Sequence, residues 1–260
     1  MKKINTYNES PLHRTLKKIY ALENDGKCEV QIEGTNWICD IVCDDARVIE
    51  IQTANISALA EKTEFLLGQG RSVMIVCPVI FQNTIIMLNE NGEKESKRKS
   101  PKKSTIYSFL RGIGGIIPLL KNQRLTVEFL YVSVTELRRK TGEKTQLANK
   151  SRRYLKQWVP EGKSLDKILK IQRFTGLDSW KTLFPKSLPP EFTKTELYDA
   201  IFSSDFLIPD LIGEKFTDTN RRASAIWYDT LLWFGKKCNI IEECGKRGRK
   251  ILYRRTRMSR

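Results

Sequence analysis

Two acidic residues on opposite strands of a predicted hairpin are the residues of this chain best suited to chemistry. Residues 37–53 alternate between apolar and polar side chains, a pattern that predicts two antiparallel strands joined by a tight turn. If the turn is residues 44–46, the register places Asp40 opposite Glu50, with their β-carbons roughly 4.5–5.5 Å apart. Two carboxylates at that spacing can contact one divalent metal ion.

Such a pair suits the hydrolysis of a phosphodiester bond. That reaction needs an activated water molecule and a group that absorbs charge on the phosphate, and a divalent ion supplies both. Mg²⁺ (or Mn²⁺) binds through one or two carboxylates and completes its shell with waters and phosphate oxygens. We therefore predict that Asp40 and Glu50 are metal ligands. Glu29, on the preceding strand, is a candidate third acid, and Gln52 is a candidate to orient the attacking water or contact the phosphate.

The two-residue period of a strand sorts this hairpin into two faces. Asp40, Glu50 and Gln52 share one face with apolar residues. The other face is nearly all apolar and is predicted to be buried, and it consists of Trp37, Cys39, Ile41, Cys43, Ile49 and Ile51. The three polar residues could simply form the wet face of a half-exposed hairpin, and this alternative stays open. Aspartate is uncommon in strands, however, which favours a pocket over an ordinary surface.

The surrounding elements are predicted from the spacing of apolar residues and from turn residues. In order, we expect a helix at 11–22, a strand at 29–33, the hairpin, a helix at 55–67, strands at 72–80 and 83–88, a helix at 106–120 and a strand at 125–134. Residues 93–104 are too highly charged to be packed and are predicted to be a solvated loop, with DNA contact at residues 100–103 as the alternative. Residues 1–139 form the first predicted domain.

A polar, basic stretch at residues 140–153 is predicted to be a linker to a second domain at residues 154–260. That domain is expected to contain short helices at 165–174, 178–183 and 193–202, a longer helix at 220–237, and two short strands around a turn at 245–248. Thr193 and Glu196 have the spacing of a capping box. Helices followed by a basic hairpin indicate a winged helix.

The charge of the chain is unevenly distributed. The formal net charge is +16, and of the 46 Lys and Arg residues 20 lie in residues 1–139 and 26 in residues 140–260, against 16 and 14 acidic residues. A basic C-terminal half predicts binding to a nucleic-acid backbone. A generally basic protein without that partner is the alternative.

The candidate DNA-binding residues lie on the longer helix and on the wing. They are Arg221, Arg222, Lys236, Lys237, Lys246, Arg247, Arg249 and Lys250. Such a helix could enter a major groove while the wing follows the backbone. Lys236 and Lys237 could instead complement the helix dipole, but that explanation does not extend to the wing. Winged helices also bind proteins, so this second role stays open.

The region from Pro11 to Ile80 resembles the PD-(D/E)XK nuclease superfamily, which has the restriction-endonuclease-like fold. The resemblance rests on the order helix, three-strand meander with Asp40, Glu50-Ile51-Gln52, helix, strand. It implies an α/β fold class (an α+β mixed sheet), here followed by a mainly α winged-helix domain. It also implies an Asp and a Glu as metal ligands and a lysine two residues after the Glu, a place that Gln52 takes here. His13 or Lys17 of the first helix is expected to face the same pocket, as first-helix polar residues do in some members.

Together these features predict a metal-dependent DNA endonuclease, with Mg²⁺ or Mn²⁺ as cofactor and DNA as partner. The alternative is a non-catalytic DNA-binding regulator on a degenerate nuclease scaffold. Zinc is a poor fit because the six cysteines include no Cys-x-x-Cys pair and the chain has one histidine. Cysteines within apolar patterns, with no secretory pattern or long apolar run, predict a cytoplasmic protein without a membrane partner. A homodimer would account for paired cuts, but no dimer surface is evident in the sequence.

Overall fold

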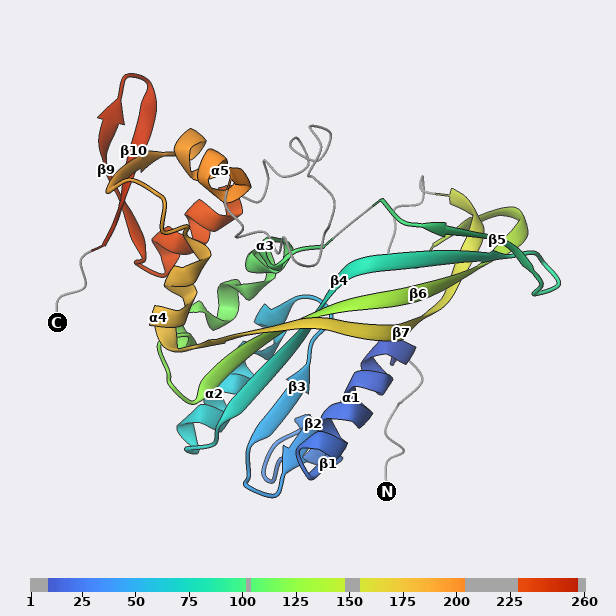
Figure 1. Cartoon of the computed structure of the whole chain (residues 1–260). Helices are drawn as coiled ribbons and strands as arrows, with labels where there is room; N and C mark the ends of the chain where they lie inside the picture. The colour runs from blue at the N-terminus through green and yellow to red at the C-terminus, as the bar shows by residue number, and fades with distance from the viewer. Residues whose placement is uncertain (1–8, 102–103, 148–154, 204–228, 257–260) are drawn as a thin grey trace. The chain divides into compact units, whose positions relative to one another are not determined.

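The computed structural model describes residues 9–101, 104–147, 155–203 and 229–256 (Figure 1). The chain forms two compact units, one of residues 1–53, 74–105 and 128–172 and one of residues 54–73, 106–127 and 173–260. The elements are α1 (Pro11–Glu23), β1 (Gly26–Gln31), β2 (Ile38–Cys43), β3 (Val48–Ile51), η2 (Ile56–Leu59), α2 (Ala60–Gly68), β4 (Val73–Leu88), β5 (Lys94–Lys99), α3 (Ile106–Leu110), η3 (Arg111–Leu119), β6 (Leu125–Gln146), β7 (Leu155–Thr175), α4 (Gly176–Trp180), η4 (Lys181–Leu183), β8 (Glu191–Thr193), α5 (Lys194–Ser203), β9 (Ile241–Arg247) and β10 (Lys250–Arg255).

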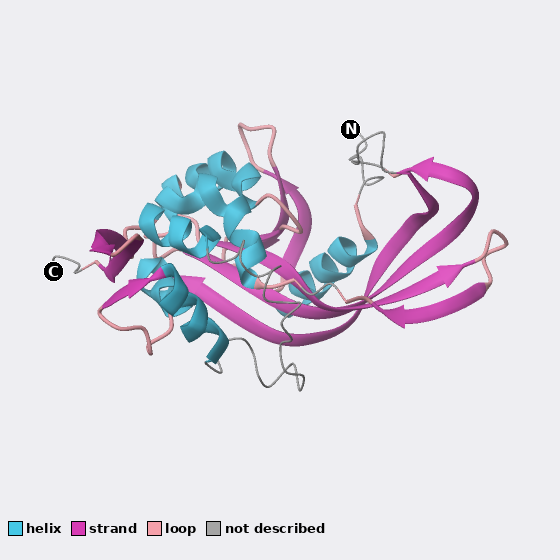
Figure 2. Ribbon diagram, turned by 90° about the horizontal axis from the view of Figure 1, so that it is seen from above, coloured by secondary structure: helices cyan, strands magenta, loops and turns pink. Residues whose placement is uncertain are grey.

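A seven-stranded mixed sheet is the main feature of the first unit. Its order is β1-β2-β3-β4-β6-β7, with β5 paired to β4. The pairs β1-β2, β2-β3 and β4-β5 are antiparallel. Strands β4 and β6 run in the same direction, because Val73 bonds Arg124 at their start and Asn83 bonds Glu136 further along. The long strands β4, β6 and β7 extend past α1 in Figure 2. The predicted mixed α/β class is confirmed.

Helix α1 begins where the sequence supplies a cap. Ser10 has an extended backbone and its hydroxyl accepts a hydrogen bond from the amide of His13, while Pro11 occupies the first turn. Leu12, Leu16 and Tyr20 recur every four residues and are buried. They pack in one core with residues of β2, β3, β4 and β6, namely Ile41, Cys43, Ile49, Ile51, Val76, Leu130, Val132 and Val134. The predicted apolar face of the hairpin is therefore the face that α1 covers.

The β2-β3 hairpin has the predicted register. Val42 pairs with Val48, and Ile41 pairs with Ile49. The turn is closed by a hydrogen bond of 2.9 Å from the amide of Cys43 to the carbonyl of Arg47. Extending this register by one pair places Asp40 opposite Glu50, as the sequence predicts.

Residues 94–99 differ from the prediction, because they form β5 and not a loop. The backbone of β5 pairs with β4 from Thr84↔Lys99 to Leu88↔Lys94. All six of its side chains are exposed. The charges are therefore tolerated because only the backbone is engaged, and charge density alone did not reveal that pairing.

The predicted linker and the helix after it are also replaced by strands. Residues 140–146 continue β6, and residues 165–174 lie in β7, its neighbour in the sheet. Leu165 and Ile168 have the three-residue spacing of a helix, yet both pack against the core under α1. Pairing with β6 overrides the local helical pattern, a common outcome where tertiary contacts decide.

The second unit combines helices with a three-stranded antiparallel sheet of order β8-β10-β9. The predicted capping box is confirmed, because Glu196 accepts from the amide of Thr193 at 2.7 Å and the Thr193 hydroxyl accepts from the amide of Glu196 at 3.3 Å. Trp180 stacks on Phe174 with ring centroids 4.4 Å apart. Residues 229–237 are helical, in agreement with the predicted longer helix, whose earlier part lies outside the described residues.

The described ranges contain no helix that could cross a membrane. None of their helices combines the length and the apolar composition that a bilayer span requires.

Candidate functional site

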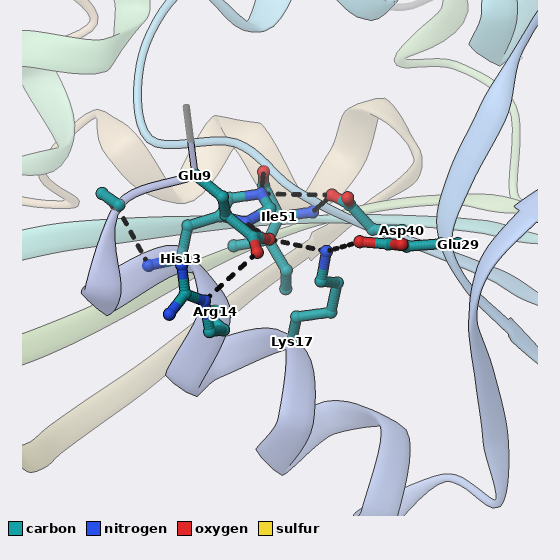
Figure 3. Close-up of polar contacts among 8 residues, drawn as sticks. Glu9, His13, Arg14, Lys17, Glu29, Asp40 and Ile51 are labelled. Carbon is teal, nitrogen blue, oxygen red and sulfur yellow. Dashed lines mark hydrogen bonds and ion pairs between the residues drawn. The ribbon is translucent and has the colours of Figure 1, made fainter. Parts of the chain in front are cut away.

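A cluster of charged side chains links α1 to the first three strands of the sheet (Figure 3). His13 and Lys17 project from α1, and Glu9 lies just before it. Asp40 comes from β2 and Glu29 from β1. His13 and Lys17 lie four residues apart, so one face of the helix presents both cations to the acids.

Asp40 is fixed by two contacts to the same oxygen. Its Oδ2 accepts a hydrogen bond of 2.8 Å from the amide of Ile51 and lies 3.3 Å from Nε2 of His13. Among the described residues, nothing bonds the other oxygen, Oδ1, and the side chain keeps 22% of its exposure. Asp40 is thus an oriented carboxylate with one oxygen available to a ligand.

His13 is surrounded by acceptors on both ring nitrogens. Its Nδ1 lies 2.5 Å from Oε1 of Glu9, and its Nε2 lies 2.8 Å from the carbonyl oxygen of Ile51 as well as near Asp40. Only the doubly protonated ring can donate from both nitrogens. The geometry therefore favours the imidazolium form.

Lys17 is a buried cation between two acids. Its side chain is 8% exposed, and its Nζ lies 2.6 Å from Oε1 of Glu9 and 3.0 Å from Oε1 of Glu29. The helix thus brings one ammonium group to acids that are 20 residues apart in the sequence.

Three acids occupy neighbouring positions across three strands. In the β1-β2 register, Cys28 pairs with Ile41 and Val30 with Cys39, so Glu29 lies opposite Asp40. The β2-β3 register in turn places Asp40 opposite Glu50. Like charges at opposite positions repel each other. Lys17 and His13 place positive charge beside two members of this row, Glu29 and Asp40.

Asp40 departs from the predicted alternation of hairpin faces, because its carboxylate reaches His13 of α1, the helix that covers the opposite, apolar face. Glu29 also reaches α1, at Lys17. Glu29 has a backbone φ of 58°, in the left-handed region that non-glycine residues seldom adopt. The Asp40 carboxylate is held in this direction because it accepts a hydrogen bond from the backbone amide of Ile51 on the partner strand β3.

The pKa values follow from these contacts. Burial raises the pKa of Asp40, but the hydrogen bonds from His13 and the Ile51 amide outweigh it and bring the pKa below its ordinary value. Burial lowers the pKa of His13, but Asp40 and Glu9 outweigh it and the pKa is raised. The same balance, with Glu9 and Glu29 as partners, raises the pKa of Lys17. At neutral pH the cluster therefore contains an ionised Asp40 beside two cations.

The other two predicted catalytic residues lie on β3 and directly after it. Glu50 is 5% exposed, in the middle of β3. Gln52 follows the end of that strand and is half-buried. Its backbone amide donates a hydrogen bond of 2.8 Å to the carbonyl of Val76 on β4. The hairpin therefore puts Asp40 and Glu50 on adjacent strands as predicted, while the described contacts of Asp40 are with α1 and with Ile51.

The donors suit a hard cation that needs few protein ligands. Within the described residues, no group of three or more His, Cys, Asp and Glu side chains is arranged to hold a metal ion. Mg²⁺ normally keeps several waters and takes one or two carboxylates, so the free oxygen of Asp40 suits it, and Glu50 occupies the opposite position on the adjacent strand. Glu29, the predicted third ligand, is instead bonded to Lys17.

Glu9 is the cluster member that the sequence reasoning missed. It precedes the cap of α1, outside the predicted helix, and its four-residue spacing from His13 was the one signal that could have indicated a contact. His13 and Lys17 were expected near the pocket only through the family resemblance. The structure places both beside Asp40 or its neighbour Glu29.

The predicted DNA-binding residues are divided between described and undescribed parts of the chain. Arg221 and Arg222 lie outside the described residues. Lys236 pairs with Glu243 at 2.6 Å, Arg247 pairs with Glu196 at 2.8 Å, and Lys250 lies 3.4 Å from the Thr195 hydroxyl.

Three more of the predicted DNA-binding cations lack such an ion pair within the described residues. In the described part of the chain, Lys237, Lys246 and Arg249 are exposed and form no ion pair. The turn between β9 and β10 therefore retains uncompensated positive charge.

Comparison with known proteins identifies the family. A protein of Treponema pallidum (strain Nichols), described only as an uncharacterized protein, is 36% identical over 129 residues, which are 50% of this chain and 50% of that protein. The chain thus spans about half the length of this curated relative. No solved structure matches. Residues 10–175, more than half of the chain, match the model of a family described as a domain of unknown function, DUF8091, and the chain belongs to this family.

Proposed function

We propose that this protein is a metal-dependent endonuclease that hydrolyses phosphodiester bonds in DNA, with Asp40 and Glu50 as the ligands of Mg²⁺ or Mn²⁺. The observation that carries the proposal is the row of opposite strand positions held by Glu29, Asp40 and Glu50, of which Glu29 and Asp40 contact the cations of α1. Acids concentrated against their mutual repulsion are more typical of a functional site than of a structural one.

The order of elements supports the same proposal. Helix α1, the meander β1-β2-β3, helix α2 and strand β4 follow one another as in the PD-(D/E)XK resemblance, and the four strands are neighbours in the sheet in that order. The two acids lie on adjacent strands of this meander.

A bound divalent ion would supply a lowered pKa for its water and positive charge against the phosphate. The residues of the chain would do the rest. Asp40 is held ionised and oriented by His13 and the Ile51 amide, so its free oxygen is directed without rotation. Glu50 adds a second oxygen donor from β3. Preorganised charge of this kind costs no rearrangement during the reaction.

Lys17 is suited to the cationic role that the lysine two residues after the Glu has in the resemblance. Gln52, at that place, is neutral and can only donate or accept hydrogen bonds. Lys17 is buried, cationic and bonded to the neighbour of Asp40 in the row, so it can balance negative charge near the scissile phosphate. We assign it this positioning role.

The second unit is proposed to bind DNA as a winged helix. Its order from α4 through β8, α5, the helix at 229–237, β9 and β10, with the sheet order β8-β10-β9, fits a helical core followed by a wing. Lys246 and Arg249 are exposed in or beside the β9-β10 turn, where they can reach a phosphate backbone.

The alternative is a DNA-binding regulator that keeps the nuclease scaffold without catalysis. The glutamine at position 52 favours it, because the resemblance implies a lysine there.

A plasmid-nicking assay tests the proposal. Supercoiled DNA is incubated with Mg²⁺ or Mn²⁺ and wild type, Asp40→Asn, Glu50→Gln or the control Asp44→Asn, an exposed acid in the turn of the same hairpin. We expect metal-dependent nicking to fall at least about 100-fold in the first two variants, because charge stabilisation by a metal is worth several kcal/mol and about 1.4 kcal/mol is tenfold in rate. The control should match wild type.

Two results would contradict the proposal. Equal nicking by all four proteins would remove the assignment to Asp40 and Glu50. Tight DNA binding by wild type without nicking in either metal would favour the regulator.

A further inference from the structure

Strand β5 is a basic edge strand with no role in the proposed catalytic site. In the described part of the chain it pairs with β4 alone, so its outer edge keeps unpaired amide and carbonyl groups. All of its side chains are exposed, and four of its six residues are lysine or arginine. Figure 1 shows β5 beside the far end of β4, away from the β1-β2-β3 meander.

The positive charge of this strand is largely uncompensated. Glu95, its one acid, forms an ion pair with Lys140 of β6. Lys97, Arg98 and Lys99 form no ion pair with any described residue. Three adjacent cations without counter-charges repel one another, so a polyanion that approached them would relieve that repulsion.

The cross-strand neighbours of these cations add no negative charge. Lys97 pairs with Ile86, Arg98 with Ile85 and Lys99 with Thr84. Cross-strand positions are where an acid would most readily stabilise a strand lysine. Uncharged residues there leave the cations available to a partner from outside the chain.

We propose that β5 binds the phosphate backbone of duplex DNA through Lys97, Arg98 and Lys99, a second contact surface for the substrate of the proposed nuclease. This inference rests on the proposed function for the choice of DNA. Side chains of a strand alternate between its two sides, with about 3.3 Å per residue. Lys97 and Lys99 therefore project to one side and Arg98 to the other, so that the edge can contact phosphates from both sides.

Protection of the sheet edge is the competing explanation. Charged residues, lysine especially, keep exposed edge strands from pairing with other chains. That explanation depends on the presence of charge and not on its sign, because glutamate also discourages pairing between identical edges. Phosphate binding depends on the sign, so charge reversal separates the two.

The test compares three variants of the full chain with wild type. One has Lys97→Gln, Arg98→Gln and Lys99→Gln, and a second has glutamate at the same three positions. The control has Lys18→Gln, Lys27→Gln and Lys186→Gln. These three lysines are exposed and lie outside β5, and their substitution removes the same amount of charge. Affinity for a labelled duplex is measured by fluorescence anisotropy over a range of salt concentrations in EDTA, so that no cleavage occurs.

We expect the glutamine variant to reduce the slope of log affinity against log salt by about 0.9 for each lost phosphate contact, up to about 2.7 for three. The glutamate variant should bind more weakly still while sedimenting as wild type does. The control should change the slope by less than about 0.9.

Slopes equal to the control in both β5 variants would overturn this inference. So would normal DNA binding by a soluble glutamate variant, which would assign β5 to edge protection. These outcomes leave the nicking assay unaffected, because that assay depends on Asp40 and Glu50. If wild type does not nick DNA but the β5 glutamine variant has a reduced salt slope, the protein binds DNA through β5 without the proposed catalysis.

Discussion

Asp40 is a half-buried and Glu136 a buried carboxylate on the large sheet, and they differ in how many of their oxygens have partners among the described residues. Glu136 is 6% exposed, and its two oxygens accept from Arg138 at 2.6 Å and from Asn83 at 2.9 Å, with Lys163 at 3.6 Å. Asp40 has one engaged oxygen and lies in a row of three acids. Two cations serve the single acid Glu136, whereas three cations are shared among three acids in the cluster around Asp40.

This difference separates a structural carboxylate from a candidate ligand site. At Glu136 the chain supplies every partner, and Arg138 is further held 3.9 Å above the ring of Trp158. At Asp40 only Oδ2 has partners among the described residues. The three cations of that cluster, His13, Arg14 and Lys17, are shared with two further acids, Glu9 and Glu29. The unoccupied oxygen of Asp40 is open to a cation, whereas the oxygens of Glu136 are already bonded.

The largest effect on folding should come from removing Lys17, the buried cation of the cluster around Asp40. Lys17→Met leaves Glu9 and Glu29 without their ammonium partner. We expect a loss of about 2 kcal/mol in the free energy of unfolding, less than for a fully buried pair because Glu29 keeps some solvent contact. Urea denaturation in EDTA measures it. Lys18→Met, at the next and exposed position of α1, is the matched control, and equal losses in both variants would remove the special status of Lys17.

Metal binding should then distinguish the two carboxylates directly. At about ten times its dissociation constant, Mn²⁺ should stabilise wild type by about 1.4 kcal/mol, because it binds the folded state alone. We expect Asp40→Asn to abolish this gain and Glu136→Gln to preserve it. Calorimetric titration gives the dissociation constant, and thermal unfolding with and without metal gives the gain. If both variants lose the stabilisation by Mn²⁺, Asp40 and Glu136 do not differ in metal binding as we expect.

A smaller effect is expected at Glu136. Burial raises the pKa of Glu136, but the hydrogen bonds from Arg138 and Asn83 and the charge of Lys163 outweigh it, and the pKa lies below its ordinary value. A carboxylate with a lowered pKa in the folded state adds stability above its unfolded pKa and loses it as the pH falls through the folded value.

Glu136→Gln should therefore cost about 1 kcal/mol at neutral pH, since the amide keeps part of the hydrogen bonding. The difference from wild type should shrink as the pH falls below the unfolded pKa of about 4.5. Urea unfolding across that range measures it. A difference that stays constant with pH would show that the charge of Glu136 contributes nothing.

The sequence was sufficient where local rules decide the structure. The turn after Cys43 and the alternation on both sides of it fix the register that sets Asp40 opposite Glu50. Side-chain spacing also predicted helix α1 and the capping box between Thr193 and Glu196. Each of these depends on residues within one or two turns of chain, which a sequence displays directly.

Sequence reasoning failed where distant pairing decides. Strand β5 is a strand only because β4 offers it a partner, and β7 is a strand only because β6 lies beside it. The contacts of Lys17 with Glu9 and Glu29 depend on how α1 lies across the sheet, which no local pattern encodes. Residue spacing alone therefore could not predict which cations contact the acids of the site.

The backbone of Glu29 leads to one more conclusion. A left-handed residue other than glycine costs of order 1–3 kcal/mol, a cost that glycine would largely avoid at the same place. A chain optimised for folding alone would be expected to carry glycine there. Glycine would also remove the carboxylate that accepts from Lys17, so at this one position the relief of backbone strain and the loss of an acceptor for a buried ammonium group oppose each other.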